Sequence, residues 1–198
     1  MNMNWNHTIK TLAFASLLAL APAQMMAAQK GGTFTTGDKT FLLNGKPFVV
    51  KAAELHYPRI PRAYWEHRIK MCKALGMNTV CLYVFWNIHE QEEGKFDFTG
   101  NNDVAAFCRL AQKNGMYVIV RPGPYVCAEW EMGGLPWWLL KKKDIRLREQ
   151  DPYFMQRVEI FEKEVGSSWL HSPSRMVVLS SWFRWRTNMV LTVRTSHT

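Results

Sequence analysis

The sequence lacks the glycine-rich phosphate-binding motifs of nucleotide-binding proteins. Neither G-x-G-x-x-G nor a P-loop occurs anywhere in its 198 residues. A doubly wound nucleotide fold places such a fingerprint directly after its first strand, because backbone amides must approach the phosphates closely. The absence therefore argues against that class of fold.

Cysteines are few and scattered, at Cys72, Cys81, Cys108 and Cys127, with no C-x-x-C pair and no histidine at ligand spacing. Structural zinc sites need such clustered ligands, so we expect no metal site. Three of the four fall inside apolar helix or strand patterns, and we interpret them as small buried residues.

No long apolar run occurs after the amino terminus, so we expect no membrane span, which takes roughly 18 to 20 such residues. Residues 1–23 are typical of a secretory signal peptide. Lys10 gives a weakly positive start, a short apolar run follows, and Ala21-Pro-Ala23 is a small-x-small cleavage pattern, with cleavage after Ala28 as an alternative. We expect an exported protein, periplasmic or extracellular.

The formal net charge of +9 comes largely from the ends of the chain. Residues 24–166 carry 20 basic and all 16 acidic residues, a net charge of +4. The only basic run, residues 141–143, is typical of a solvated loop. This balance does not indicate a nucleic-acid partner.

Turn residues and hydrophobic periodicity predict a hairpin followed by alternating strands and helices. Asn44-Gly45 lies between two apolar runs in residues 41–50, a strong hairpin signal. The remaining segments predict strands at 49–52, 79–83 and 117–120, and helices at 62–75, 103–113 and 151–165. Each predicted strand runs into a loop rich in aromatic and acidic residues.

The two earlier helices have identifiable inner faces and ends. The helix at 62–75 should bury Trp65, Ile69, Cys72 and Leu75 and end at Gly76. The helix at 103–113 should begin at a cap on Asn101 or Asn102 and bury Val104, Phe107, Leu110 and Ala111. The strand and helix alternation favours an α/β fold with a parallel sheet, and the loops favour a (β/α)8 TIM barrel truncated after about three βα units.

The loop after the third strand is the candidate functional segment. Its aromatic and acidic residues are Tyr125, Glu129, Trp130, Glu131, Trp137 and Trp138. Pyranose rings lie on aromatic faces and their hydroxyls bind carboxylates, so the loop is suited to sugar binding at the carboxyl end of a parallel strand. The alternative is that the tryptophans are core residues and the glutamates are solvated.

Six ordered motifs resemble glycoside hydrolase family 35, the retaining β-galactosidases, over roughly residues 37–166. They are His56-Tyr-Pro-Arg59, Gly76-Met-Asn-Thr-Val80, Tyr83-Val-Phe-Trp-Asn-Ile-His-Glu90, Gly94-Lys-Phe-Asp-Phe98, Arg121-Pro-Gly-Pro-Tyr-Val-Cys-Ala-Glu-Trp130 and Gly133-Gly-Leu-Pro-Trp-Trp-Leu139. The resemblance implies a TIM barrel, a galactoside or oligosaccharide substrate and no cofactor. It also implies that galactose is held by Tyr83, by the Ala128 region and by the Glu129 carboxylate.

Further polar and aromatic residues lie in or beside these motifs. Two roles stay open for His56, Trp86, Asn87, His89 and Glu90, which either line the site or brace the strand ends. We interpret Glu131 as an outward acid, and Trp137 and Trp138 as packing under the loop.

Retaining hydrolysis needs two carboxyl groups about 5 Å apart. The resemblance implies an acid/base glutamate in an Asn-Glu-Tyr-Gly motif after the fourth strand and a nucleophile after the seventh. This chain has neither motif, so we expect it to lack activity as it stands. The alternatives are a non-catalytic sugar-binding or poorly folded fragment, and a different barrel glycosidase such as a β-glucanase.

Residues 167–198, the tail, differ in character from the rest of the chain. The tail has no Asp, Glu or Gly, although acids and glycine make up roughly 12% and 7% of ordinary chains. It also has no helix or strand periodicity. We therefore expect a non-native tail produced by a shift in reading frame.

A codon comparison carries this expectation. At this place the family has a segment resembling Asn-Gly-Gly-Pro-Ile-Ile-Met-Val-Gln-Val-Glu-Asn-Glu-Tyr-Gly-Ser-Tyr. Permitted codons for that segment, read from the second base, spell the 17 residues from Met176 to Thr192. The lost acid/base glutamate codon then falls at Thr187 and Asn188.

Overall fold

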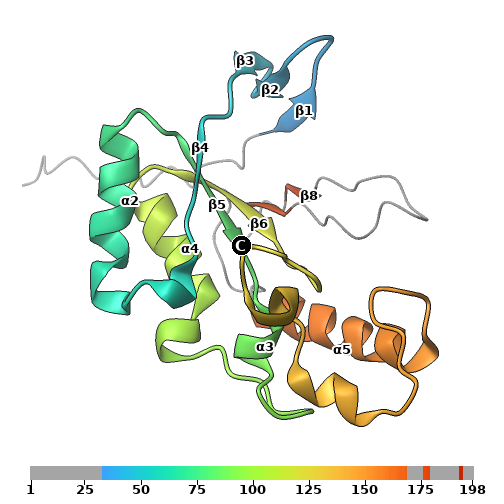
Figure 1. Ribbon diagram of the computed structural model, residues 1–198. Helices are drawn as coiled ribbons and strands as arrows, with labels where there is room; N and C mark the ends of the chain where they lie inside the picture. Colours follow the sequence, from blue (N-terminus) through green and yellow to red (C-terminus); the bar gives the residue numbers. More distant parts are fainter. Residues whose placement is uncertain (1–32, 169–175, 179–191, 194–198) are drawn as a thin grey trace, which may run out of the picture. The chain divides into compact units, whose positions relative to one another are not determined.

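The computed structural model describes residues 33–168, 176–178 and 192–193 of the chain (Figure 1). The expected signal peptide, residues 1–23, lies outside the described residues. Most of the tail, including Thr187 and Asn188, lies outside them as well.

A small antiparallel sheet opens the described part. Its strands are β1 (Phe34–Thr36), β2 (Phe41–Leu43) and β3 (Lys46–Phe48), in that order. Asn44 and Gly45 connect β2 to β3 with φ of 53° and 74°, as a two-residue type I′ turn requires. The predicted hairpin is confirmed, with β1 as an additional strand.

The larger sheet has four parallel strands and one antiparallel edge strand. They are β4 (Ala52–Glu54), β5 (Thr79–Tyr83), β6 (Tyr117–Arg121), β7 (Met176–Val178) and β8 (Thr192–Val193), in that order. The alternation had predicted only the first three. Over the described residues the sheet stays open and forms no closed barrel.

The first parallel strand begins later than predicted. The Asn78 side chain accepts a hydrogen bond from Lys51 N at 2.9 Å and donates one to Val49 O at 2.8 Å. These hydrogen bonds use the amide of Lys51 and the carbonyl of Val49, so the parallel pairing of β4 with β5 starts only at Ala52.

Helices follow β4, β5 and β6 in turn. The α-helices are α2 (Trp65–Ala74), α3 (Trp86–His89), α4 (Val104–Lys113) and α5 (Pro152–Ser168). Short 3-10 turns are η1 (Tyr57–Arg59), η2 (Arg62–Tyr64), η3 (Gly100–Asn102), η4 (Glu131–Gly134) and η5 (Trp137–Lys141). No helix among these described residues is long and apolar enough to cross a membrane.

Two details of the helices correct the sequence-based expectations. The cap of α4 is Asp103, whose carboxylate accepts from Ala106 N at 2.8 Å, because Asn101 and Asn102 are used by the preceding turn η3. Leu75 is 75% exposed rather than buried, since α2 ends at Ala74 and the chain turns away through Gly76 at φ 84°.

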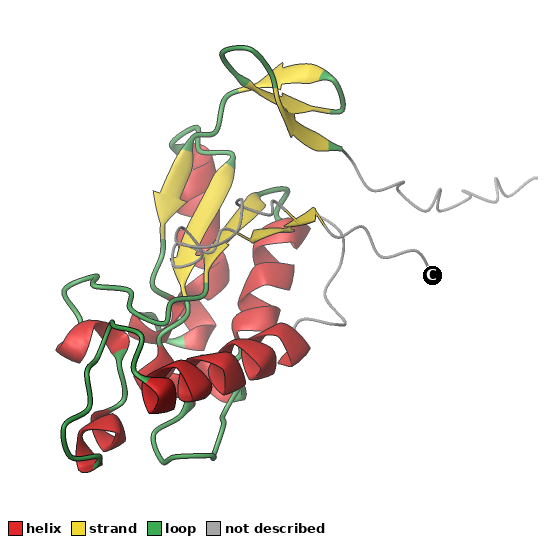
Figure 2. Ribbon diagram, turned by 90° about the vertical axis from the view of Figure 1, so that its right-hand side faces the viewer, coloured by secondary structure: helices red, strands yellow, loops and turns green. Residues whose placement is uncertain are grey.

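Alternation along the strands divides the large sheet into two faces. Val80, Leu82, Val118 and Val120 are fully buried in one cluster with side chains of α2, α4 and α5. The residues between them point the other way, and we name that side the Tyr83 face. Figure 2 shows the helices beside the strands of this sheet and the small sheet at the amino-terminal end of β4.

A buried ion pair fastens α5 to the segment after β5. Glu90 is fully buried, and its carboxylate accepts hydrogen bonds from Arg157, from Trp86 Nε1 at 2.6 Å and from Gly94 N at 2.7 Å. Trp86 stacks on Phe161 of α5 with ring centroids 5.0 Å apart. Trp86 and Glu90 therefore brace the strand end and do not face the site.

His89 has the same bracing role. It is fully buried, its Nδ1 donates to Asp97 O at 2.8 Å, and its Nε2 accepts from the Tyr57 hydroxyl. In the neutral imidazole each ring nitrogen therefore has a hydrogen-bond partner. Burial lowers the pKa of His89 to about 4.

We predict that His89 makes stability depend on pH. Its folded pKa of about 4 lies below the ordinary value of 6.5, so the unfolded state binds the proton first as the pH falls. The free energy of unfolding should drop by about 2 kcal/mol from this group between pH 7 and pH 5. Urea unfolding followed by tryptophan fluorescence measures the drop. The His89→Gln variant should lose this pH-dependent drop. A drop of the same size in His89→Gln would show that other groups cause it. His67→Gln, at an exposed histidine, is the matched control and should retain the drop.

Candidate functional site

Three parallel strands end side by side with polar residues at their carboxyl ends. The register pairs Glu54 with Cys81 and Tyr83 with Arg121. Residues paired across a parallel ladder point to the same side of the sheet, so all four lie on the Tyr83 face. Glu54, Tyr83 and Arg121 are the last residues of β4, β5 and β6.

Tyr83 is held by its neighbour on β6. Its side chain is largely buried, its hydroxyl accepts a hydrogen bond from Arg121 Nη1, and the guanidinium lies 4.3 Å from the centre of its ring. Burial raises the pKa of the Tyr83 phenol; Arg121 opposes this shift, and the Glu54 carboxylate adds to it by its charge and a hydrogen bond. The phenol therefore stays protonated at neutral pH.

His56 links the β4 end to Tyr83. Its Nε2 lies 2.8 Å from Glu54 Oε1, and its ring packs edge-on against Tyr83 and Phe85 at centroid distances of 5.5 and 5.4 Å. Of the residues whose role the sequence left open, His56 is the one that lies in this group.

The loop after β6 has an unusual backbone where it carries the candidate carboxylate. Cys127, Ala128 and Glu129 have φ of 62°, 51° and 46° in succession, in the left-handed region that residues with a side chain rarely adopt. Trp130 N donates to Cys127 O at 3.0 Å and closes this turn. Such a backbone persists only where surrounding contacts hold it.

Arg59 supplies those contacts from the end of η1. Its Nη2 donates to Ala128 O at 3.1 Å and to Glu129 O at 2.8 Å, and its guanidinium lies 4.6 Å from the centre of the Trp130 ring. Asn87 holds the other end of Trp130 by accepting from its indole Nε1 at 3.1 Å. The left-handed turn is thus clamped from the β4 and β5 loops.

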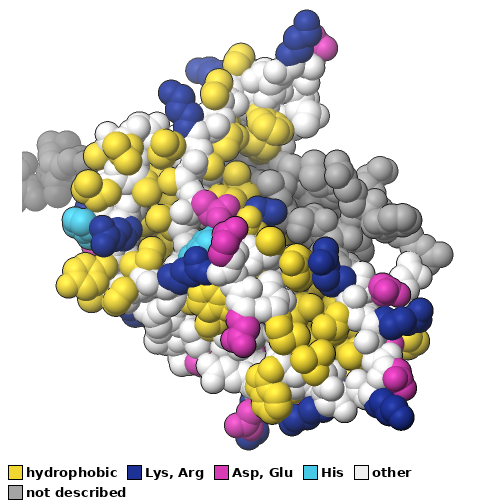
Figure 3. Space-filling model, viewed as in Figure 1, with side chains coloured by type: hydrophobic (Ala, Val, Ile, Leu, Met, Phe, Trp, Pro, Cys, Tyr) yellow, Lys and Arg dark blue, Asp and Glu magenta, His cyan; other side chains and the backbone are white. Residues whose placement is uncertain are grey.

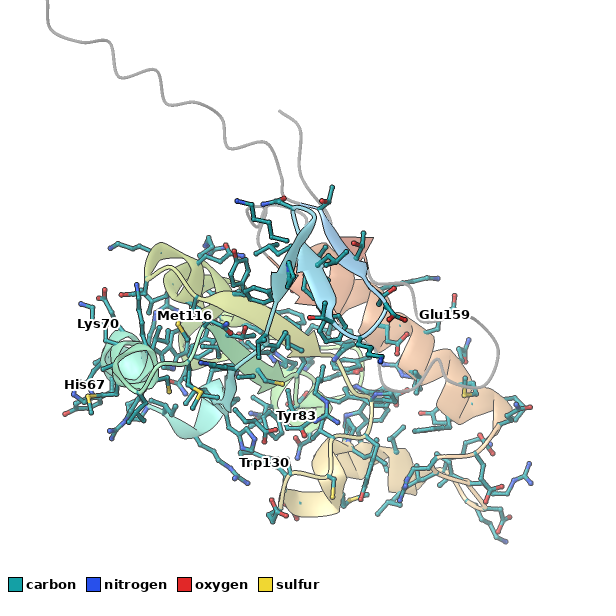
Figure 4. All side chains as sticks on the ribbon, turned by 90° about the horizontal axis from the view of Figure 1, so that it is seen from above. His67, Lys70, Tyr83, Met116, Trp130 and Glu159 are labelled. Atoms are coloured by element: carbon teal, nitrogen blue, oxygen red, sulfur yellow. The ribbon has the colours of Figure 1, made fainter. Side chains whose placement is uncertain are left out.

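The predicted site residues differ in exposure. Ala128 is buried, with 9% of its surface exposed, whereas the Glu129 side chain is exposed and makes no hydrogen bond to any described residue. Its backbone is fixed while its carboxylate is left available. Figure 4 shows Tyr83 and Trp130 between α2, which carries His67 and Lys70, and α5, which carries Glu159.

Glycine is required beneath this loop. Gly133 has φ 61°, and a Cβ atom there would come within 2.0 Å of the Tyr125 ring. The loop backbone at Gly133 therefore packs directly against the Tyr125 ring, which holds residues 125–133 together. Val126 N donates to Gly133 O at 2.8 Å and ties its two ends together.

The two adjacent tryptophans have different roles. Trp138 is buried, stacks edge-on against Trp86 and donates from Nε1 to Glu90 O at 2.8 Å, as the packing prediction required. Trp137 is 56% exposed, so the same prediction is wrong for it. It lies at the start of η5, and its indole Nε1 donates to Gln91 O at 3.2 Å while much of the ring stays exposed. Glu131 is exposed as expected.

The cysteines are less buried than predicted. Cys108 is buried, Cys72 and Cys81 are half-buried, and Cys127 is exposed in the left-handed turn. Among the described residues, no three His, Cys, Asp or Glu side chains lie close enough together to hold a metal ion.

Glu54, Arg59 and Arg121 have no role that the sequence motifs alone indicate. Arg59 ends the motif that begins at His56, but its contacts reach residues about 70 positions further along the chain. Figure 3 shows acidic, basic and histidine side chains gathered near the middle of the face viewed in Figure 1. A charged group beside aromatic rings can bind a polar ligand with flat apolar faces.

Comparison with known proteins places this geometry in a family. Residues 40–171 match the family model of glycosyl hydrolases family 35. The chain is 50% identical to a β-galactosidase of Xanthomonas manihotis over 148 residues, which are 75% of this chain and 25% of that protein. It is 44% identical to a β-galactosidase of Mus musculus over 148 residues, 75% of this chain and 23% of that protein. The chain spans about a quarter of the length of the curated relatives it matches.

Solved structures agree on the fold. An exo-β-1,4-mannosidase from Opitutaceae bacterium strain TAV5 matches with a TM-score of 0.55 at 18% identity, over 68% of this chain and 24% of that one. The GH5_18 protein of Bifidobacterium longum subsp. longum matches with a TM-score of 0.52 at 16% identity, over 66% and 32%. These neighbours are TIM-barrel glycosidases, and at this identity the likeness concerns the fold alone.

We predict that Arg59→Met loosens the left-handed turn. Loss of two hydrogen bonds from a charged donor should speed amide hydrogen exchange at Trp130 and Gly133 by about 10- to 100-fold. Arg62→Met is the matched control, because Arg62 also donates to a backbone carbonyl and lies over a tryptophan, but at Gly100 and Trp65. Unchanged exchange at Trp130 in Arg59→Met would show that the turn is held without the clamp.

Proposed function

Because the chain belongs to glycoside hydrolase family 35, we propose that it derives from a retaining β-galactosidase, which hydrolyses terminal β-galactosides. Residues 37–166 form the first three βα units of its (β/α)8 barrel. The observation that carries the proposal is that Tyr83, at the carboxyl end of β5, shares a buried cluster with Ala128 of the clamped turn that carries Glu129. Barrel glycosidases build their sites at that end.

We assign galactose binding to Tyr83, Ala128 and Glu129. The exposed Glu129 carboxylate accepts hydrogen bonds from sugar hydroxyls, and the left-handed turn that carries it is held in place by Arg59. Tyr83 contributes a hydroxyl fixed by Arg121. A site that fixes hydroxyl partners in advance discriminates strongly between sugars that differ in one hydroxyl.

This chain carries only the binding half of such a site. Retaining hydrolysis takes two carboxyl groups about 5 Å apart, and both belong to later strands of the barrel in this family. We propose that the tail is an out-of-frame translation in which the acid/base codon falls at Thr187 and Asn188. The end of the family match at residue 171, before Met176, supports this. We also propose export, with residues 1–23 removed.

Nucleotide sequence and activity test the proposal together. The bases under residues 176–192, read in the other frame, should spell Glu-Asn-Glu-Tyr-Gly. The 198-residue chain should give no turnover of a chromogenic β-galactoside, and the full-length protein with its frame restored should hydrolyse it. Turnover by the 198-residue chain that is lost on changing Glu129 would contradict the incomplete-site proposal.

A second candidate function is a non-catalytic sugar-binding piece, and it is favoured by the exposed Glu129 carboxylate on its clamped turn, because binding a sugar hydroxyl needs an oriented acceptor and no second carboxyl group. Galactose binding to the chain without turnover by the restored protein would support it. A poorly folded fragment would bind no sugar at all. A panel of aryl glycosides on the restored protein separates a β-galactosidase from another barrel glycosidase such as a β-glucanase.

We predict that Glu129→Gln weakens galactose binding in the restored protein. A hydrogen bond to a charged group contributes about 1.5 to 3 kcal/mol, so affinity should fall by roughly 10- to 150-fold. Thermal unfolding should be unchanged because the side chain makes no hydrogen bond to a described residue. A loss of stability at unchanged affinity would assign Glu129 a structural role. Glu131→Gln, on a neighbouring exposed acid, is the control.

A further inference from the structure

Glu54 lies on the same side of the sheet as the candidate sugar-binding residues. It ends β4 and pairs in register with Cys81, two residues before Tyr83 on β5. Its side chain is 46% exposed, so the carboxylate is within reach of a ligand.

The carboxylate is oriented by protein partners. His56 Nε2 lies 2.8 Å from Oε1 of Glu54, and the His56 ring rests edge-on against Tyr83. On the far side of Tyr83, Arg121 donates to the phenol oxygen. Imidazole, carboxylate, phenol and guanidinium thus form a row across the ends of β4, β5 and β6.

This row leaves acceptor positions open. An ionised carboxylate offers about four lone-pair positions, and His56 and Tyr83 occupy two at most. Because Tyr83 accepts from Arg121, its own proton is free to point toward Glu54, the neighbouring acceptor. A sugar hydroxyl reaching the Tyr83 face would meet two fixed acceptor oxygens on adjacent strands, one on each residue.

A solvated ion pair does not account for this arrangement as well. Exposed ion pairs contribute little and hold no fixed geometry. The Glu54 carboxylate is instead hydrogen-bonded at 2.8 Å to Nε2 of His56, whose side chain is only 14% exposed and therefore held in place. The group is oriented at a place where barrel glycosidases bind substrate.

We propose that Glu54 is a further galactoside-binding residue, whose carboxylate accepts a hydrogen bond from one sugar hydroxyl beside Tyr83. The proposal rests on the proposed function and extends its substrate site from the ends of β5 and β6 to the end of β4. It assigns Glu54 to binding and not to bond cleavage.

The experiment uses the full-length protein in its restored frame, where the site is complete. Competitive inhibition constants are measured for galactose and for its 2-, 3-, 4- and 6-deoxy analogues. Glu54→Gln replaces a charged acceptor by a neutral one, so the inhibition constant for galactose should rise about tenfold. One deoxy sugar should bind Glu54→Gln as well as it binds the wild type, because the missing hydroxyl is the partner of Glu54. Glu159→Gln on α5 is the matched control, an exposed glutamate paired with Lys163 and remote from Tyr83 (Figure 4), and it should leave all constants unchanged.

The outcomes separate binding from positioning. Unchanged galactose binding in Glu54→Gln overturns the proposal. Another outcome is that Glu54→Gln weakens the binding of galactose and of every deoxy sugar equally, by about tenfold, and has no effect when Tyr83→Phe is also present. That result also overturns the proposal, because Glu54 then acts only through Tyr83. If Glu54→Gln does not fold, Glu54→Asp, which keeps the charge but withdraws it, is put through the same comparison and decides in the same way. A wild-type protein without β-galactosidase activity fails at the proposed function first, and the Glu54 proposal falls with it.

Discussion

The register of the parallel ladder is the constraint on which the site depends. Because Tyr83 pairs with Arg121 and Glu54 with Cys81, the ends of three strands meet at one edge with their polar residues on the same face. A shift of one residue would turn these side chains toward the helices and expose the valines of the core. The buried alternate residues of β5 and β6 therefore fix the site as firmly as they fix the fold.

The loops add what the sheet cannot supply. The left-handed turn at residues 127–129 needs contacts from outside, and Arg59 provides them from the loop after β4. Glu90 anchors the loop after β5 to α5 by a buried ion pair with Arg157. Removing one partner of such a pair is strongly destabilising, since the other is left charged and buried. Site geometry and packing thus share the same few long-range contacts.

Much of the fold followed from sequence because its signals are local. β5 and β6 are apolar runs bounded by turn residues, and Asn44-Gly45 set the hairpin. The predicted start of β4 was wrong because the side chain of Asn78, distant in sequence, forms hydrogen bonds with the backbone of residues 49 and 51. The candidate roles of Tyr83 and Glu129 came from family motifs, whereas Arg59 acts across about 70 residues, a separation that no local pattern indicates.

We propose that the carboxyl ends of β4 to β6 and the clamped turn form the galactose-binding half of a family 35 site. A crystal structure of the full-length protein with bound galactose tests this assignment. We expect sugar hydroxyls within hydrogen-bond distance, about 2.5 to 3.2 Å, of the Glu129 carboxylate and the Tyr83 hydroxyl, with Arg59 still bonded to the turn. Galactose bound elsewhere, or with both side chains turned away from it, would show that these residues do not form the galactose site.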